Sequence, residues 1–508
     1  MKKNKVIIVG GGVSGLSLGI FCQKYGFETV IIEKNNIAGG NLTGWRRNGC
    51  YIDNCIHWLN GSKSKTPTNQ LFKQIGALDD DTQFHQSEFF YVSEHDGKKV
   101  GLGLDLEKTK QNMIDCCPQD KKQIEKFVKA TKICIELSKT TNCFSKIFQC
   151  AKLFCLYGKK TLEEIAQKCT TPLFKNVLTD YILGEYSIYV LLLAYSSFAN
   201  GDGKVLKNGS LDMATKIAKY YQKLGGKILL GKTAEKIQEE GKKTKVVCGD
   251  ESFESDVVVF ACDAKVTFEK ILNTKMPKRL QKMYDHRTSY PIISSFHVAF
   301  DVALPKVDIP DSFVFDCPKT KIANTVYDRI MIRNYDYGNN YAPDGHCVLQ
   351  IFLLTREYDY DYFAKLTKQE YVKQKEEISK QLLKIVTQKF DFLQDKITIL
   401  DCWTPLTYTR YFDAYKGSYM SFGITKKVCF SRQTFKIEPF QNVFFATQWQ
   451  TMFGGLPNAA RQGKKCADLL DKLYDWKSCL ICIFVFFKSI LSSKQSTQIE
   501  KPSKNCAG

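Results

Sequence analysis

Three glycines and one acid near the start of the chain are spaced for binding a nucleotide. Gly10, Gly12 and Gly15 form the pattern GxGxxG, and Glu33 follows after a further apolar stretch. The first glycine permits a tight turn, the second lets a pyrophosphate approach the backbone, and the third lets a helix pack on a strand. The acid can accept hydrogen bonds from a ribose. For the glycines alone, a tight turn without a ligand is the alternative interpretation.

The elements around these residues form a βαβ unit. Lys5–Val9 is predicted to be a buried strand, residues 16–25 a helix, and residues 28–33 a second strand. In such a unit the phosphate lies at the helix N-terminus, whose partial positive charge stabilises it. The candidate binding residues of this segment are Gly10, Gly12, Val13, Ser14, Gly15, Glu33 and Lys34.

A second glycine pair follows in the segment Ala38-Gly-Gly-Asn-Leu-Thr43. Such a pair lets the chain cross close to the pyrophosphate. With the first motif, it resembles the fingerprint of the two-dinucleotide-binding-domain flavoproteins, the superfamily of amine oxidases and phytoene desaturases. The resemblance implies that FAD is the cofactor and that Gly39, Gly40, Asn41 and Thr43 contact it. The spacing is GGxxT where the superfamily has GGxxxT, and Asn41 stands where many members carry arginine.

Two downstream segments resemble further parts of the same superfamily. Thr233-Ala-Glu-Lys-Ile237 is similar to the strand that brackets the adenine; an ordinary edge strand is the alternative. Residues 444–463 resemble the closing motif of phytoene desaturases, in which a helix N-terminus points at the flavin pyrimidine and stabilises its negative charge when reduced. Thr447 replaces the usual glycine there, and without the family the motif is only a turn before a helix. The residues that this resemblance assigns to the cofactor are Ala234, Gln448, Gly455, Leu456 and Pro457.

The substrate side of the sequence carries weaker patterns. Residues 53–61 resemble a loop of the retinol-saturase and carotenoid-isomerase branch that has the pattern D-x-G-I-H-Y, with Cys55 replacing its glycine. The resemblance implies that His57 lies near the isoalloxazine ring, where an imidazole can donate to the flavin or shuttle a proton. A packed histidine is the alternative. Residues 403–412 are similar to a Thr-Pro segment of phytoene desaturases, and their aromatics suit either a polyene-binding wall or a sheet core.

The sequence shows no second nucleotide-binding motif that could hold an electron carrier. No further GxGxxG follows, so the sequence predicts an external electron acceptor or donor. The cysteines lack the paired spacing of zinc ligands, and we predict no metal site.

The charge balance points to an anionic surface as a partner. The chain has 73 Lys and Arg against 53 Asp and Glu, a net charge of +20. The lysines are spread beside aromatic and aliphatic residues, as in residues 144–156, which favours peripheral contact with a membrane and argues against nucleic acid. A solvated, lysine-rich surface is the alternative.

Compartment and membrane topology also follow from the sequence. The first ten residues run directly into a strand without a leader, so we predict a cytoplasmic protein that is peripheral to a membrane, with its 20 cysteines as free thiols. No apolar run reaches the roughly 18 residues of a membrane-spanning helix. The longest runs are residues 188–195, predicted to be a buried helix, and residues 479–487.

The fold class follows from these segments: an α/β protein with a discontinuous Rossmann-like FAD-binding domain, a mixed-sheet substrate domain and a helical insertion. Three parts form the FAD-binding domain: residues 1–115, 206–290 and 431–476. Residues 116–205 are the helical insertion, which serves as membrane contact or substrate lid, and residues 291–430 are the substrate-binding sheet domain. Residues 477–508 are an apolar segment and a disordered tail.

The leading hypothesis is an FAD-dependent oxidoreductase, similar to phytoene desaturases, that acts on carbon–carbon bonds of a hydrophobic isoprenoid or polyene by desaturation, saturation or isomerisation. An amine or porphyrinogen oxidase on the same scaffold is the first alternative. The second is a non-enzymatic binder of lipidated proteins, against which the glycine triplet and Glu33 argue.

Overall fold

A five-stranded parallel sheet brings together three distant parts of the chain in the computed structural model, which describes residues 4–337, 340–426 and 434–474. Its strand order is β19-β13-β1-β2-β9. The strands are β1 (Lys5–Val9), β2 (Glu28–Ile32), β9 (Lys227–Leu229), β13 (Val257–Phe260) and β19 (Val443–Phe445). The discontinuous α/β fold predicted from the sequence is therefore confirmed. Residues 477–508, predicted to be an apolar segment and tail, lie outside the described residues.

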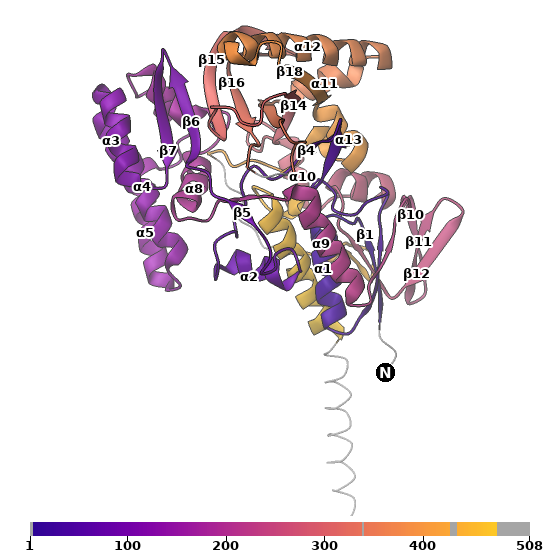
Figure 1. Cartoon of the computed structure of the whole chain (residues 1–508). Coiled ribbons are helices and arrows are strands. Elements are labelled where there is room, and N and C mark those ends of the chain that lie inside the picture. The colour runs from indigo at the N-terminus through magenta and orange to yellow at the C-terminus, as the bar shows by residue number, and fades with distance from the viewer. Residues whose placement is uncertain (1–3, 338–339, 427–433, 475–508) are drawn as a thin grey trace, which may run out of the picture.

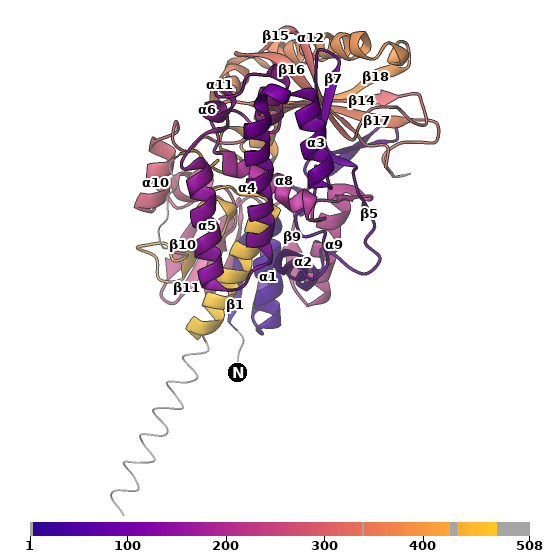
Figure 2. The same ribbon diagram turned by 90° about the vertical axis from the view of Figure 1, so that its left-hand side faces the viewer.

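Alternate residues of β1 face the two layers that cover this sheet. Val6 and Ile8 pack against the helix layer, while Ile7 and Val9 pack on the opposite side. The helices of the first layer are α1 (Val13–Lys24), α9 (Gly209–Lys223) and a C-terminal helix at 456–474, which lie side by side in Figures 1 and 2. The other side is covered by the antiparallel sheet of β10 (Lys236–Glu240), β11 (Lys243–Cys248) and β12 (Glu251–Ser255) and by η2 (Val266–Ile271). Strands buried on both faces explain the apolar runs.

The second large sheet is mixed and has seven strands, in the order β18-β14-β17-β16-β15-β6-β7. Its strands are β6 (Phe89–His95), β7 (Lys98–Gly103), β14 (Ser294–Val302), β15 (Ser312–Ile322), β16 (Thr325–Asn334), β17 (Cys347–Thr355) and β18 (Ile397–Trp403). The sequence-based boundaries group β6 and β7 with residues 1–115; in the structure they extend this sheet, because β6 pairs with β15 at Val92 and Phe313. α12 (Lys368–Lys389) covers the outer face and lies at the top of Figure 1.

Two predicted elements differ from the structure. Residues 403–412 are one of the segments for which the sequence allows a sheet core, but Pro405–Phe412 is helix α13, because Thr404 caps its N-terminus and Pro405 occupies the first turn. The strand predicted from residue 233 begins only at Lys236. Before it, the N–H of Lys232 bonds to the carbonyl of Glu33, which keeps this stretch beside the parallel sheet.

Helices that pack beside the mixed sheet form one wall of the molecule, at the left of Figure 1 and facing the viewer in Figure 2. They are α3 (Leu106–Cys116), α4 (Lys121–Lys139), α5 (Cys143–Tyr157), α6 (Leu162–Ala166), α7 (Pro172–Thr179) and α8 (Ile188–Ala199). The prediction that residues 188–195 form a buried helix is confirmed by α8, since most of its side chains are buried. Among the described residues, no helix combines the length and the apolar character needed to cross a bilayer.

Shorter elements complete the described chain. They are β3 (Gly44–Arg47), β4 (Cys50–Asp53), α2 (Pro67–Gln74), β5 (Phe84–His85), η1 (Pro118–Asp120), β8 (Val205–Leu206), α10 (Lys278–Asp285), α11 (Glu357–Lys365), η3 (Asp391–Leu393), η4 (Tyr415–Gly417) and η5 (Gln448–Gln450).

Candidate functional site

A cavity of about 1390 Å³ lies where the three segments of the parallel sheet meet the helical wall and the mixed sheet. It is lined by all but two of the residues that the sequence assigns to the cofactor, and by His57. Those lining residues are Gly10, Gly12, Val13, Ser14, Glu33, Lys34, Gly39, Gly40, Asn41, Ala234, Gln448, Gly455, Leu456 and Pro457. Segments separated by more than 400 residues thus converge on one space.

The N-terminus of α1 fits a pyrophosphate. Gly12 precedes the helix without a side-chain cap, and Leu16 is the first helical residue whose N–H bonds back, at 2.9 Å, to the Gly12 carbonyl. The preceding N–H groups of the first turn therefore lack a helical partner beside the cavity. A methyl group placed on Gly12 would meet only the Cα of Gly40, at 4.0 Å, so its hydrogen faces open space. The backbone is thus free to approach a ligand.

The second glycine pair, Gly39 and Gly40, is hydrogen-bonded to the first glycine motif and packs against it. The N–H of Gly39 donates to the carbonyl of Gly11 at 2.8 Å, and a methyl group on Gly40 would lie 3.2 Å from the Cα of Gly12. Gly39 and Gly40 have φ values of +127° and +58°, a region that favours glycine. Asn41, at the position where many superfamily members carry arginine, accepts a 2.9 Å hydrogen bond from Asn54. Its amide is therefore held beside the cavity.

The two predicted residues outside the lining have structural roles. A methyl group on Gly15 would lie 2.0 Å from the carbonyl oxygen of Gly10, so this glycine permits α1 to pack on β1. Thr43 is buried, and its carbonyl accepts a hydrogen bond from the N–H of Asn54 at 3.2 Å.

Glu33 is held in place by the motif that it accompanies. Its carboxylate is buried and accepts hydrogen bonds from the N–H groups of Gly11 at 2.7 Å and Asn35 at 2.9 Å. An anionic acceptor fixed at the end of β2 suits the hydroxyl groups of a ribose. The next residue, Lys34, pairs with Asp413 at 2.5 Å.

The closing motif aims a helix at the same cavity. The helix at 456–474 begins directly after Gly455, whose φ of +97° turns the chain. The Oε1 of Gln448 accepts the N–H of Gly455 at 2.8 Å, and its Nε2 donates to the carbonyl of Tyr419 at 3.1 Å. Leu456, the first helical residue, lines the cavity. Its helix N-terminus can stabilise a negative charge there.

His57 lines the same cavity, with its ring centre 4.7 Å from that of Phe352. Burial lowers its pKa well below the usual value, and the charges of Arg333 and His297 lower it further, so the imidazole is neutral at pH 7. No described residue hydrogen-bonds its ring nitrogens. The ring is therefore available to a bound molecule, as its candidate role requires.

Sequence reasoning missed several charged residues of the lining, among them Asp263 and Arg333, which are buried. Asp263 follows β13, and burial raises its pKa to about 7 although it accepts hydrogen bonds from the N–H groups of Lys265 and Tyr415. Arg333 lies near the end of β16 and is 5% exposed. A lone basic residue at the end of the apolar run from Ile330 is the only sequence signal for it.

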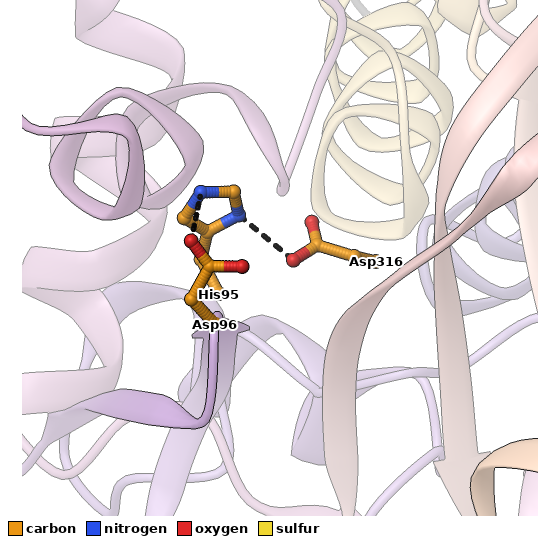
Figure 3. A group of neighbouring side chains, drawn as sticks. All are labelled: His95, Asp96 and Asp316. Atoms are coloured by element: carbon orange, nitrogen blue, oxygen red, sulfur yellow. Dashed lines mark hydrogen bonds and ion pairs between the residues drawn. The ribbon is translucent and has the colours of Figure 1, made fainter.

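One cluster of the described residues has the side chains that metal ions prefer. Figure 3 shows His95 bonded through Nδ1 to Asp316 at 2.7 Å, with its Nε2 3.5 Å from Asp96. Asp316 also pairs with Arg329. None of these residues lines the cavity. The cluster is best described as an ion-pair network between β6, β15 and β16.

Comparisons with known proteins agree with this geometry. Residues 13–470 match a family described as flavin-containing amine oxidoreductase. The chain is similar to the all-trans-retinol 13,14-reductase of Danio rerio, with 19% identity over 467 residues, 81% of this chain and 76% of the relative. It is 23% identical over 332 residues to the 1-hydroxycarotenoid 3,4-desaturase of Flavobacterium sp. (strain P99-3), 60% of this chain and 65% of the relative. An oxidoreductase from Methanosarcina mazei shares the fold, with a TM-score of 0.59 and 13% identity over 91% of this chain and 100% of that structure.

Proposed function

The chain belongs to the family of flavin-containing amine oxidoreductases, whose usual flavin is FAD, and on this premise we propose that it oxidises or reduces carbon–carbon bonds of a hydrophobic isoprenoid or polyene. One observation carries the proposal: the cavity continues beyond the predicted nucleotide residues between walls of apolar and aromatic side chains. These include Phe90, Tyr181, Met331, Phe352, Leu354, Tyr419, Met420 and Phe453. Such walls bind an extended apolar chain by burying its surface.

The residues of the chain bind, orient and exclude water, while bound FAD supplies the hydride chemistry. The N-termini of α1 and of the helix at 456–474 both face the cavity and favour anionic parts of the cofactor. His57, neutral at pH 7, can hold or pass a proton at a ring nitrogen. Electrons leave or arrive through an external acceptor or donor.

The charges of the cavity argue against a cationic amine as substrate. Each lining carboxylate of the described residues is already held: Glu33 and Asp263 by backbone N–H groups, Asp202 by the N–H of Gly61, and Asp413 by Lys34. On the apolar side the buried charge is that of Arg333, which repels an ammonium group. A porphyrinogen, which carries carboxylates, remains the alternative that the experiment must separate.

Anaerobic flavin spectroscopy tests the proposal. The purified FAD form is mixed with a retinoid, a carotenoid, putrescine or protoporphyrinogen, and the oxidised flavin band is followed; the reduced form is tested with the same polyenes. We expect the polyenes to change the flavin redox state at least about 100-fold faster than putrescine does, a barrier difference of roughly 3 kcal/mol. Turnover of the amine or the porphyrinogen without turnover of any polyene would refute the proposal.

We also propose that α5 brings the mouth of the cavity to an anionic membrane. Phe144, Ile147, Phe148 and Phe154 are each more than half exposed, with Phe144 at 84%. Lysines accompany them, and Lys152 lies 4.2 Å from the ring centre of Phe148. The start of α5 and the turn before it reach the cavity through three lining residues, Thr140, Thr141 and Lys146. A hydrophobic substrate could therefore enter from the bilayer without crossing water.

The double variant Phe144→Ser/Phe148→Ser tests this contact. Each exposed ring contributes about 1.5–3 kcal/mol when it enters an apolar phase, so we expect binding to phosphatidylglycerol-containing vesicles to fall at least about tenfold. Vesicle co-sedimentation measures the bound fraction. Phe392→Ser, at a 40% exposed ring beyond α12, is the matched control and should bind like the wild type. Unchanged binding of the double variant would contradict the contact.

A further inference from the structure

Arg333 places a buried positive charge in an otherwise apolar part of the cavity wall. It lies in β16 with its side chain on the same face as Met331, and both line the cavity. Its cross-strand neighbours are Ser312 on β15 and Gln350 on β17. The residue as a whole is only 5% exposed, so bulk water scarcely solvates its charge.

The protein satisfies this guanidinium only in part, through a backbone carbonyl and the neighbouring side chains of Tyr335 and Tyr337. Its Nη2 donates to the carbonyl of His57 at 2.6 Å, and its carbon lies 5.9 Å from the ring centre of Tyr335. Its Nε is buried and has no hydrogen-bond partner among the described residues. No described carboxylate lies within 4.0 Å of it; Asp311 attracts it from farther away but is bonded to His85 at 2.6 Å.

A neighbouring arginine shows how this fold neutralises a structural charge. Arg329 lies four residues earlier on β16 and donates to Asp180 through Nε at 2.7 Å and Nη2 at 2.8 Å. It also pairs with Asp316. A buried arginine that serves the fold alone is expected to have such partners, because an unpaired buried charge is strongly unfavourable. Arg333 has no carboxylate partner of this kind among the described residues, although it opens on a cavity.

We propose that Arg333 binds the carboxylate of an amphipathic substrate whose apolar chain lies along Met331 and Phe352. This inference rests on the proposed function for the identity of the chain, an isoprenoid. The planar guanidinium matches a carboxylate, to which it can donate two parallel hydrogen bonds. A diphosphate needs more positive charge than one guanidinium provides. Among the described lining residues, the other basic side chains belong to segments other than the mixed sheet.

Ligand binding to the oxidised holoenzyme tests the assignment without any turnover. Retinoic acid, retinol and methyl retinoate share one isoprenoid chain and differ only at the head, and the perturbation of the flavin band gives their dissociation constants. We expect the acid to bind at least about tenfold more tightly than the alcohol or the ester. In Arg333→Gln the affinity for the acid should fall about 30-fold or more, with that for retinol changed by less than about threefold. Arg333→Lys should recover part of the loss.

Two controls make the outcome decisive. Arg461 also lines the cavity but donates to Asn458 and Thr68, so Arg461→Gln should retain the preference for the acid. Equal affinities of the wild type for acid and alcohol would overturn the assignment, as would a preference lost in Arg461→Gln and kept in Arg333→Gln. Palmitate separates this inference from the proposed function: Arg333-dependent binding of palmitate, with no redox change by any polyene, would support the carboxylate site and refute the isoprenoid reaction.

Discussion

Gly12→Val is expected to give a folded protein that has lost its FAD. Gly12 has an extended φ of −72°, which any residue adopts, and a methyl group there meets only Gly40 Cα at 4.0 Å. A valine side chain would instead fill the space that a pyrophosphate needs. We expect FAD content after purification to fall at least about tenfold, since overpacking of this kind costs about 1–3 kcal/mol. The ratio of flavin to protein absorbance measures it.

The comparison with Gly15→Val separates loss of cofactor from loss of fold. A methyl group on Gly15 would lie 2.0 Å from the carbonyl oxygen of Gly10, so this substitution forces α1 away from β1. We expect Gly15→Val to lower the thermal midpoint of the apoprotein, and Gly12→Val to leave it close to that of the wild-type apoprotein. A Gly12→Val protein that remains yellow would show that the cofactor does not approach this backbone. A purified wild-type protein that shows no flavin absorbance and binds lipidated proteins would favour the alternative of a non-enzymatic binder.

The nucleotide half of the fold could be predicted because its signals are local. The strand, glycine turn and helix around Gly10 and Gly15 are encoded within about thirty residues, and they appear as β1, α1 and β2. Gly10 and Gly455 are 445 residues apart in the sequence. That they lie at one site was predictable only from the resemblance to the flavoprotein superfamily. In the structure Gly10 and Gly455 both line the cavity.

The substrate half depends on pairings that a sequence does not display. β6 joins β15 across more than 200 residues, with Val92 beside Phe313, and no local pattern specifies that partner. Arg333 is buried only because β16 is an inner strand, between β15 and β17. In the sequence it looks like one more basic residue in a chain with a charge of +20. The most informative side chain of the cavity therefore became visible only in three dimensions.

Arg329→Met is expected to destabilise the folded protein strongly. Arg329 joins β16 to Asp180, the C-cap residue that follows α7, and the side chain of Asp180 is 2% exposed. Removing one member of a buried ion pair leaves the other uncompensated and costs about 3–5 kcal/mol. With an unfolding entropy of about 2 cal/mol/K per residue, a chain of this length should lose roughly 3–5 °C in thermal midpoint. Calorimetry of the holoenzyme measures it.

The double variant Arg329→Met/Asp180→Leu shows whether the stability is lost because Asp180 keeps an uncompensated charge or because the ion pair itself is missing. Both charges of the buried pair are then absent, and Asp316, which also loses Arg329, is 40% exposed to solvent, so we expect most of the thermal midpoint to return. Arg47→Met, whose side chain is 53% exposed in its pair with Asp401, should change the midpoint by less than about 1 °C. A single variant as stable as the wild type would show that this pair does not hold the helical wall to the sheet.

This ion pair also links stability to the shape of the cavity. Asp180 directly precedes Tyr181, which lines the cavity from the helical wall, and Arg329 lies two residues before Met331, which lines it from the sheet. Loosening the pair should therefore move these two walls relative to each other while leaving the glycine motifs at α1 intact. We expect Arg329→Met to weaken binding of the apolar ligand more than it lowers FAD content, and the double variant to recover both. Equal loss of ligand and FAD would instead indicate that the whole fold, and not this wall, depends on Arg329.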